Sequence, residues 1–501
     1  THLKDIRTIL DDFSFTLNSG DKAVIIGEEG NGKSTLLKLI YDPDLVNGYV
    51  EYTGQIIRNN LKLGYLAQEL TEKQKALSVY EFCLGSDSFF DMTPKELSGT
   101  ASRLNLKSDV FYSDRKIGTF SGGEKVKLQF ALTLAEKPDI LLLDEPSNDL
   151  DIETLEWLEQ FINTCGLPVI FVSHDETLIE NTANVIIHIE QTRRKTVPKY
   201  TIARMDYQSY IHERSVRLSH QEQAARKEQS DYEKQMEKYR QIQSKVEHQQ
   251  NVISRGDPHG GQLLKKKMRA VKSMGKRFER EHEEMTEMPD VEEAIMLKFG
   301  SSITVPKGKT VLNFKLDRLA VGGRVLSENI ELTANGGDKI CITGKNGVGK
   351  TALLRVIAGQ LLRRQDIKAA YMPQNYEDVI NPCKTPVEYL SESGTKDEIT
   401  AVRTLLGSAK YTALEMEHRI SDLSGGQKAK LLFLKMIYSG SNVLILDEPT
   451  RNFSPLSNSV IRDILKSFGG AIISVSHDRK YINEVCGKVF ELTENGLSTV
   501  R

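Results

Sequence analysis

The sequence predicts an α/β fold with two copies of one domain, each built on a parallel sheet, joined by a long antiparallel α-helical hairpin. Three observations predict this arrangement. Four sequence segments occur twice in the same order, which indicates a duplicated domain. Short apolar runs alternate with amphipathic segments in each copy, as in a parallel sheet that is buried on both faces. A charged segment between the copies carries apolar residues at helical spacing.

The duplication sets the expected domain limits. "GEEGNGKSTLL" returns as "GKNGVGKTALL", and three later segments return at one spacing of 303 positions: Ser121 and Ser424, Glu145 and Glu448, His174 and His477. We therefore predict a first copy over 1–200, a linker over 201–298 and a second copy over 299–501. The second copy has a strand-like "VLNFKLDRL" where the first has only nine residues. We expect a few residues of that first β-strand to be absent from this sequence.

Each copy contains the motif G-x-x-x-x-G-K-[ST], which follows an apolar strand and opens a helix. Backbone N–H groups of this loop and the helix N-terminus cradle nucleotide phosphates, the lysine contacts the β- and γ-phosphates, and the hydroxyl binds Mg²⁺. One such match could arise by chance, but two in ordered sets leave little room for it. The predicted phosphate-binding residues are Gly27, Gly30, Gly32, Lys33, Ser34 and Thr35, and Gly344, Gly347, Gly349, Lys350 and Thr351.

Acidic, histidine and glutamine residues follow the other apolar strands, where an open α/β sheet binds its ligand. Asp144 and Asp447 end strands at the usual position of a Mg²⁺-holding carboxylate, and the next residues, Glu145 and Glu448, can polarise the attacking water. His174 and His477 can reach the γ-phosphate, and Gln68 and Gln374 can contact both Mg²⁺ and the attacking water. With Ser34 and Thr351, these residues predict two sites for ATP and Mg²⁺.

"SGGE" and "SGGQ" open two further helices, and a helix N-terminus with glycine amides and a serine hydroxyl forms an anion site. Two copies facing head-to-tail would then sandwich two nucleotides. The residues are Ser121, Gly122, Gly123 and Glu124, and Ser424, Gly425, Gly426 and Gln427. The ordered motifs resemble those of ATP-binding-cassette ATPases over both halves of the chain.

By this resemblance, each composite site combines one cassette's P-loop, Gln, Glu and His with the SGG motif of the other cassette. Site I takes the SGG motif of the second cassette, and site II that of the first. The family stacks adenine on an aromatic residue ahead of the P-loop, and neither half has one there.

Two departures fall in site I. Glu29 stands where the second copy has Asn346, and Ser454 stands where the first copy has Asp151. Glu28 is expected to point away from the phosphates. We predict that site I binds ATP but hydrolyses it more slowly than site II.

Composition excludes several classes of protein. The net charge of −2 indicates no overall affinity for nucleic acid, so any such surface must be local. The five cysteines are scattered, with no C-x-x-C pair, which fits free thiols in a reducing cytoplasm. No apolar run approaches the roughly 20 residues that cross a bilayer.

The linker reads as two helices. Tyr232, Met236, Tyr239, Ile242 and Val246 follow helical spacing, as do Leu264, Met268, Val271, Phe278 and Met285, and "SRGDPHGG" marks a turn through Gly261. About forty residues per arm correspond to a rod of roughly 60 Å. Between 240 and 280, eleven Lys/Arg face only three acids. A solvated coiled coil is the simpler interpretation, but a basic tip near 248–267 suits RNA phosphates. The candidate RNA-binding residues are Lys245, Arg255, His259, Lys265, Lys266, Lys267, Arg269 and Lys272.

Two cassettes joined by such a hairpin resemble the ABC-F ATPases, and "DEPTRNFSPLS" resembles their Vga/Lsa-type antibiotic-resistance branch from Gram-positive bacteria. The resemblance implies a cytoplasmic monomer that hydrolyses ATP with Mg²⁺ and enters the E site of the 70S ribosome. There its linker tip would reach 23S rRNA, displace the P-site tRNA and protect the peptidyl-transferase centre from pleuromutilins, lincosamides and streptogramin A. A housekeeping ABC-F translation factor, an exporter's ATPase subunit and a DNA-repair ATPase are the alternatives.

Overall fold

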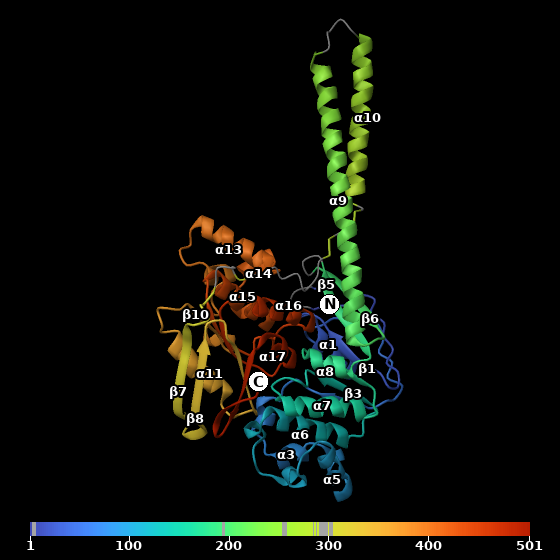
Figure 1. Cartoon of the computed structure of the whole chain (residues 1–501). Coiled ribbons are helices and arrows are strands. Elements are labelled where there is room, and N and C mark those ends of the chain that lie inside the picture. The colour runs from blue at the N-terminus through green and yellow to red at the C-terminus, as the bar shows by residue number, and fades with distance from the viewer. Residues whose placement is uncertain are drawn as a thin grey trace. The chain divides into compact units, whose positions relative to one another are not determined.

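The computed structural model describes residues 1–2, 7–192, 196–252, 258–283, 285–286, 288–289, 299 and 304–501. The chain divides into two compact units, one of Thr1–Tyr207 with Glu292–Arg501 and one of Gln208–Val291. The first unit contains both cassettes and the second contains the helical linker (Figure 1). The predicted domain limits after residues 200 and 298 stay predictions.

Each cassette is built on a six-stranded sheet, and the two sheets have the same strand order. The orders are β2-β3-β4-β1-β5-β6 and β10-β11-β12-β9-β13-β14. In each sheet the last pair is antiparallel and the other pairs are parallel. The first sheet comprises β1 (Lys22–Ile26), β2 (Leu63–Leu66), β3 (Ile140–Asp144), β4 (Val169–Val172), β5 (Val185–Thr192) and β6 (Val197–Ala203). The second comprises β9 (Lys339–Thr343), β10 (Ala369–Met372), β11 (Val443–Asp447), β12 (Ala471–Val475), β13 (Lys488–Thr493) and β14 (Gly496–Thr499).

The central strands are apolar because helices cover the sheets on both faces. Every residue of β1, β4, β11 and β12 is buried. Parallel strands in this environment read as continuous apolar runs rather than alternating ones. The predicted strands "AVIIG", "ILLLDE", "VIFVSHD" and their second copies are therefore confirmed, and so is the predicted α/β fold with two P-loop domains.

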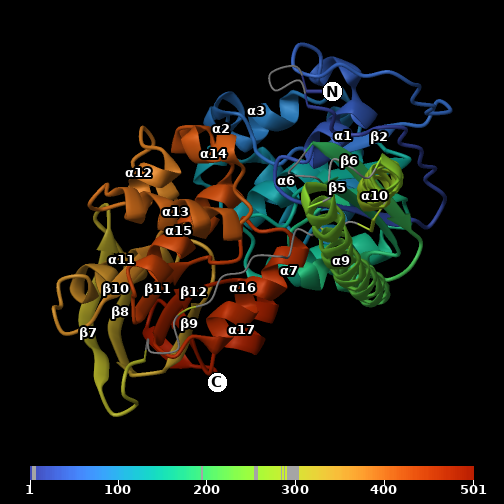
Figure 2. The same cartoon turned by 90° about the horizontal axis from the view of Figure 1, so that it is seen from above.

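The helices of the two cassettes follow similar orders along the chain. In the first cassette they are α1 (Lys33–Tyr41), α2 (Glu72–Ala76), α3 (Val79–Leu84), α4 (Asp87–Phe90), α5 (Pro94–Arg103), α6 (Gly122–Ala135), α7 (Ile152–Thr164) and α8 (Glu176–Thr182). In the second they are α11 (Lys350–Leu361), α12 (Pro386–Leu390), α13 (Lys396–Ser408), α14 (Ala413–Glu417), α15 (Gly425–Tyr438), α16 (Pro455–Ser467) and α17 (Arg479–Val485). Figure 2 shows the two cassettes side by side, and α17 of the second cassette contacts α8 of the first.

The second cassette has an additional antiparallel pair of strands, β7 (Thr310–Val321) and β8 (Arg324–Asn335). The pair contains "VLNFKLDRL", which confirms the predicted strand. Val311, Leu312, Ile330 and Leu332 are buried in one apolar core with α11 and β9. At the corresponding place in the first cassette, residues 8–20 are described without a strand.

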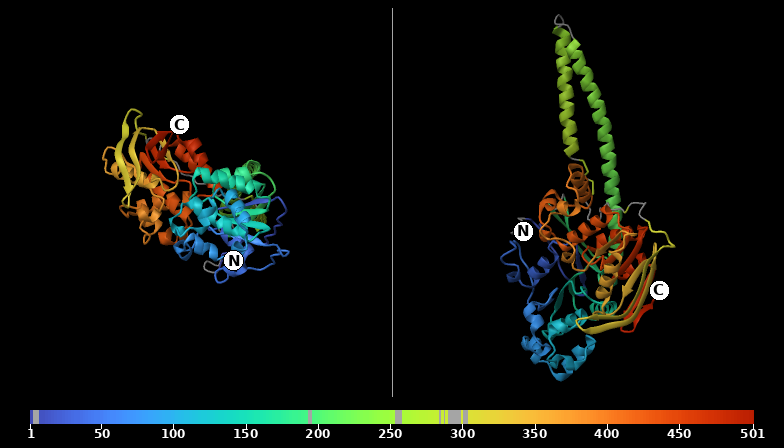
Figure 3. Two further views of the ribbon diagram at one scale, coloured as in Figure 1. Left: turned by 90° about the horizontal axis from the view of Figure 1, so that it is seen from below. Right: turned by 90° about the vertical axis from the view of Figure 1, so that its left-hand side faces the viewer.

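The linker forms an antiparallel pair of helices, α9 (Tyr207–Val252) and α10 (Pro258–Glu283), which run side by side in Figures 1 and 3. Tyr232 stacks on His282 with ring centroids 4.5 Å apart, and Tyr239 meets Phe278 edge-on at 6.0 Å. From the first contact to the second, the residue number increases on α9 and decreases on α10. The two helices therefore run in opposite directions. The predicted helical hairpin is confirmed.

The structure adds one detail to the predicted hairpin and corrects another. Ile242 is 42% exposed, whereas Val246 is buried. The buried face of α9 contains Tyr239 and, seven residues later, Val246. Ile242 lies between them in sequence but points away from this face. The predicted turn through Gly261 is shorter, because α10 already begins at Pro258, whose fixed φ suits the first helical position. The first part of the predicted turn, 254–257, lies outside the described residues.

Phe278→Ala is expected to loosen the hairpin. The ring is 6% exposed and contacts Tyr239, and truncating a buried phenylalanine costs about 3 kcal/mol or more. Hydrogen exchange of the full-length protein should then speed up at amides of α9 and α10 around this contact and stay unchanged in the cassettes. Lys276→Ala, at an exposed position on the same helix, is the control. Unchanged protection in Phe278→Ala would contradict this packing.

Candidate active site

Both P-loops follow a sheet strand and open a helix, as predicted. Gly32 and Gly349 have φ of 82° and 104°, a left-handed conformation that glycine adopts without strain. They precede α1 and α11, and neither helix has a side chain capping its N-terminus. The first N–H groups of these helices are therefore available to an anion. The two lysines are buried: Lys33 donates to the carbonyls of Gly27 and Glu28, and Lys350 to those of Gly344 and Lys345.

Site II is a cavity of about 840 Å³ between the two cassettes. The second cassette contributes Lys350 and Thr351, and the first contributes Ser121 and Gly122 from its SGG motif. The predicted head-to-tail pairing thus places these residues in one cavity. Its other lining residues at the predicted positions are Gly347, Gly349, Gln374, Asp447, Glu448 and His477.

One wall of the site II cavity is apolar. Leu319, Val321 and Leu326 of β7 and β8 line it, together with Val356 of α11. This wall can receive a purine face without the aromatic residue that the sequence lacks. Sequence reasoning identified the strand but not its place in the site, because contact between a hairpin and a distant helix leaves no local pattern.

Asp447 fits a bound cation. It ends β11 and is 1% exposed, and both of its carboxylate oxygens lie without a hydrogen-bond partner among the described residues. Burial raises its pKa. An orphaned buried carboxylate is costly unless a cation or proton joins it. Thr351 lines the same cavity, so a hydroxyl and a carboxylate, both oxygen donors of the kind that Mg²⁺ prefers, are present together.

Glu448 follows Asp447 in a strained backbone conformation, with φ of 51°. Its carboxylate accepts from the Ser476 hydroxyl and from the backbone N–H of His477, each at 3.2 Å. Burial, reinforced by the charge of Asp447, raises the pKa of Glu448 to about 7. Burial and the nearby Lys350 lower the pKa of His477 to about 4, so its ring is neutral at pH 7.

The first cassette also holds the second P-loop from the side. The Asn346 side chain donates to the carbonyl of Asp149 at 2.6 Å, and its backbone N–H reaches Asp151 at 3.4 Å. Asp151 caps α7 with its other carboxylate oxygen. Gln374 donates to the Asp149 side chain at 3.3 Å, so it lies against the opposite cassette. Sequence reasoning did not assign roles to Asn346 and Asp149.

Site I is much smaller than site II. Its cavity of about 230 Å³ is lined by Glu29, Gln68, Glu145 and His174, with Asn452 from the second cassette. Neither Lys33 nor Ser34 is among the described residues that line it. The Ser34 hydroxyl instead donates to Asp144 at 2.7 Å, and the Tyr65 hydroxyl donates to the same carboxylate at 3.1 Å.

The acidic residues of the first P-loop both contact the second cassette. Glu29 accepts a hydrogen bond from the backbone N–H of Gly426, within the SGG motif. Glu28 forms an ion pair with Lys430 at 3.1 Å. Lys430 is a buried residue of α15 in the other cassette. That Glu28 points away from the phosphates stays a prediction. The SGG motif of site I already holds a carboxylate where its glycine amides would meet a phosphate.

Glu145 is surrounded by hydrogen-bond donors. Gln68 donates to it at 3.0 Å and Asn148 at 2.6 Å, and the His174 Nε2 atom lies 3.5 Å from its carboxylate. Nδ1 of His174 donates to the carbonyl of Phe453 in the other cassette at 2.8 Å. Burial would raise the pKa of Glu145, but the hydrogen bond and charge of His174 outweigh it and lower this pKa to about 2.

The SGG motifs also fix their own helices. Ser121 and Glu124 form a reciprocal capping box at the start of α6, and Ser424 and Gln427 form one at the start of α15. S-x-x-[EQ] is a sequence signature of this box, so the pattern could have been recognised from the sequence. Gly123 packs against Thr154 of α7, where a Cβ atom would lie 2.7 Å from its hydroxyl.

The candidate RNA-binding residues of the linker are mostly on its surface. Lys245, Lys265, Lys266, Lys267, Arg269 and Lys272 are all exposed. Arg255 lies outside the described residues, and so does the side chain of His259. In the described ranges, none of the helices combines the length and the hydrophobicity needed to cross a bilayer.

Comparisons with known proteins agree with this geometry. A family profile described as "ABC transporter" matches residues 10–148 and 327–451. "Ribosome protection protein VmlR" of Bacillus subtilis (strain 168) is 30% identical over 98% of this chain and 85% of its own length. "ABC transporter F family member 5" of Arabidopsis thaliana is 25% identical over 98% of this chain and 73% of its own length.

Among solved structures, the complex of "archaeal ribosomal stalk protein aP1 and archaeal ribosome recycling factor aABCE1" aligns with a TM-score of 0.58 and 18% identity, over 97% of this chain and 87% of that chain. That similarity supports the fold of paired cassettes. The family profile covers both cassettes, and the relatives match nearly the whole chain. The chain therefore belongs to the ABC-F family of tandem-cassette proteins and is an ATPase.

Proposed function

We propose that this ATPase is a cytoplasmic factor that binds the 70S ribosome in its ATP-bound state. It enters the E site, and its linker tip displaces the P-site tRNA and protects the peptidyl-transferase centre from antibiotics. Pleuromutilins, lincosamides and streptogramin A are the proposed drugs, as in the Vga/Lsa branch. The observation that carries the proposal is the match to a ribosome protection protein across 98% of this chain, linker included.

The charges of the linker support an RNA partner. Leu264, Val271 and Phe278 are buried in the hairpin, so its packing is satisfied internally. The exposed cations Lys265, Lys266 and Lys267 take no part in that packing. Such cations bind phosphates by charge and counterion release. No Phe, Tyr or Trp lies between Gln241 and Arg277, which favours recognition of RNA shape and backbone over base stacking.

We propose that site II is the main hydrolytic site. Lys350 and the N-terminus of α11 hold the phosphates, and Ser121 and Gly122 close over them from the other cassette. Thr351 and Asp447 would hold Mg²⁺, which when bound would neutralise phosphate charge. Glu448 accepts a proton from the attacking water, and neutral His477 donates a hydrogen bond to the γ-phosphate.

We propose that site I binds ATP and hydrolyses it slowly. The Glu29 carboxylate accepts a hydrogen bond from the Gly426 amide, so this amide is not available to a phosphate. The Glu145 carboxylate accepts hydrogen bonds from Gln68 and Asn148, so it is not available to the attacking water. ATP at site I then serves mainly to hold the cassettes closed. Binding energy available only in the closed state biases the ribosome toward the protected conformation.

The double variant Glu145→Gln/Glu448→Gln is expected to remain on ribosomes in the presence of ATP. Both substitutions block hydrolysis while leaving the phosphate-binding loops intact, so the closed state persists. In a sucrose-cushion pelleting assay, most of the variant should sediment with 70S ribosomes with ATP and little without it. Lys350→Ala, which weakens phosphate binding, is the matched control and should stay unbound. A double variant found only in the supernatant would refute ribosome binding.

Drug protection requires a separate assay. Lys265→Gln/Lys266→Gln/Lys267→Gln is expected to keep ATPase activity but to lose most protection of translation in vitro from a pleuromutilin. If the unmodified protein restores no translation in the presence of any of the three drug classes, yet binds ribosomes with ATP, the housekeeping function replaces the protective one.

A further inference from the structure

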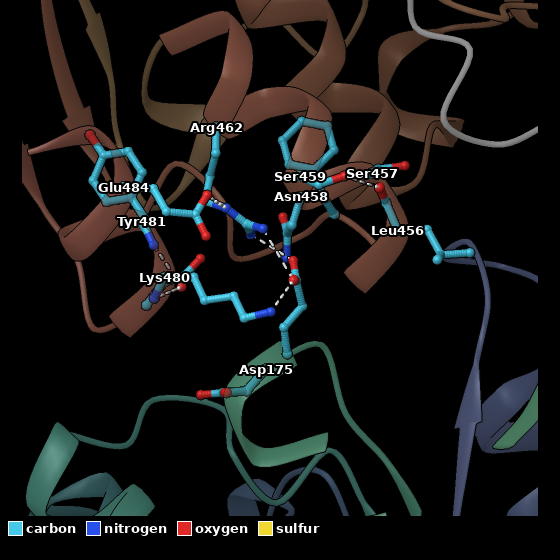
Figure 4. A network of polar contacts seen from close by, with 12 residues as sticks. Asp175, Leu456, Ser457, Asn458, Ser459, Arg462, Lys480, Tyr481 and Glu484 are labelled. Atoms are coloured by element: carbon cyan, nitrogen blue, oxygen red, sulfur yellow. Dashed lines mark hydrogen bonds and ion pairs between the residues drawn. The ribbon is translucent and has the colours of Figure 1, made fainter. Parts of the chain in front are cut away.

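Two ion pairs, one buried and one partly buried, join the cassettes away from the nucleotide sites. Arg462 of α16 makes a bidentate contact with Glu176 of α8, at 2.6 and 3.1 Å, and their side chains are 4% and 6% exposed. Arg479 of α17 pairs with Glu159 of α7, with 16% and 12% exposed. None of these four residues is among those that line the 840 Å³ cavity. Figure 4 shows Arg462 pointing from the second cassette toward the segment of the first cassette that contains Asp175.

The two pairs are related by the internal repeat. The spacing of 303 positions that relates Glu145 to Glu448 also relates Glu159 to Arg462 and Glu176 to Arg479. Each pair therefore joins the same two structural positions, with the cassettes exchanged. Both acids belong to the first cassette and both arginines to the second. At both equivalent positions, the residue of the first cassette is acidic and the residue of the second cassette is basic.

Neighbouring residues extend this division of charge. Lys480 of the second cassette contacts Glu176 at 3.0 Å and also Glu180 of α8. Glu484 steadies Arg462 from within its own cassette at 2.8 Å, and Asn181 donates to Glu159 at 2.9 Å in the first. Asp175 lies 3.6 Å from Arg479. The first cassette thus presents a carboxylate surface, and the second presents cations that match it.

We infer that this surface is a charge key that makes the second cassette the required partner of the first and prevents like cassettes from pairing between chains. Two first cassettes would place Glu159 against Glu176, and two second cassettes would place Arg462 against Arg479. Burying like charges together is strongly unfavourable, and repulsion against the wrong partner is an established route to specificity. The linker raises the effective concentration of the correct partner within one chain.

The test uses two full-length chains, each with the charges of this surface reversed in one of its two cassettes. The all-acidic chain carries Arg462→Glu, Arg479→Glu and Lys480→Glu. The all-basic chain carries Glu159→Arg, Glu176→Arg and Glu180→Lys. Each alone is expected to lose about tenfold or more in ATPase activity, because its cassettes repel one another. An equimolar mixture is expected to recover at least a third of wild-type activity and to sediment as a dimer, since each cassette then finds its complement on the other chain.

Two outcomes would overturn the inference: single-side variants with wild-type activity, or a mixture that stays monomeric and inactive. The ATPase readout rests on the composite sites proposed above, whereas sedimentation does not, so the two failures are distinguishable. Because the charge-reversed variants could fail to fold, a double-mutant cycle with charge-neutralising substitutions provides a second test. Glu176→Gln and Arg462→Gln are each expected to lower activity severalfold, and the double variant by no more than either. Multiplying losses would show that the pair is not coupled and would also overturn the inference.

Discussion

Glu448→Gln is expected to lower the steady-state ATPase rate by about 10²-fold or more, whereas Glu145→Gln is expected to lower it by less than about threefold. A general base contributes about 10²–10⁴-fold to the rate of a reaction in which it removes a proton. Glutamine keeps the size and hydrogen bonding of glutamate but cannot accept the proton. The unequal result follows if turnover passes mainly through site II.

The geometry of the two glutamates supports this asymmetry. Glu448 lines the larger cavity together with Lys350 and Thr351. Its carboxylate accepts hydrogen bonds from a serine hydroxyl and a backbone N–H, and the Nε2 atom of His477 lies 4.0 Å away. Glu145 lines the small cavity, where two side-chain amides and a histidine already surround it. A water molecule activated by Glu145 would have to displace one of these partners first.

The rates should be measured with each single variant at saturating ATP and Mg²⁺, with Glu145→Gln/Glu448→Gln as the background. Binding of a fluorescent ATP analogue to each variant separates lost catalysis from lost affinity. Equal losses in the two single variants would show that both sites turn over, and the asymmetry would be wrong.

Much of this site could be predicted from sequence because its chemistry is local. A P-loop combines a strand, glycines with left-handed φ and a helix N-terminus within a dozen residues, so one short pattern specifies the phosphate site. Asp447 and Glu448 follow an apolar strand, and the sheet topology alone brings them to the P-loop. The repeat then implied a second copy of every element. The parallel central strands, the linker hairpin and the head-to-tail pairing agree with what those patterns predicted.

The remaining features depend on contacts between the cassettes, which no local pattern records. The ion pair of Glu28 could not be predicted, because its partner Lys430 lies about four hundred positions away in the sequence. The left-handed backbone of Glu448 is a strain that only the folded site imposes. Glu159 and Arg462 look like ordinary helix-surface charges until the two cassettes are placed together, although the repeat spacing alone would have revealed their opposite signs.

Glu29→Asn is expected to raise the affinity of site I for ATP about tenfold. The Glu29 carboxylate now accepts a hydrogen bond from the Gly426 amide, which a phosphate would otherwise use. A hydrogen bond to a charged group contributes about 1.5–3 kcal/mol net, and ATP must displace it while also facing a like charge. Asparagine removes the charge and restores the residue that the second P-loop has at Asn346.

The reverse substitution provides a matched control at the symmetric position. Asn346→Glu is expected to weaken ATP binding at site II by about tenfold or more, because it adds a carboxylate near Asp151, whose carboxylate already meets the Asn346 backbone. Site I has Ser454 at the position of Asp151, which explains how Glu29 is tolerated there. Equilibrium dialysis in the Glu145→Gln/Glu448→Gln background, over a range of ATP concentrations, gives the two affinities without turnover. Affinities that do not move in opposite directions would mean that Glu29 does not compete with the phosphate, and the slow turnover of site I would then have to arise at Glu145 alone.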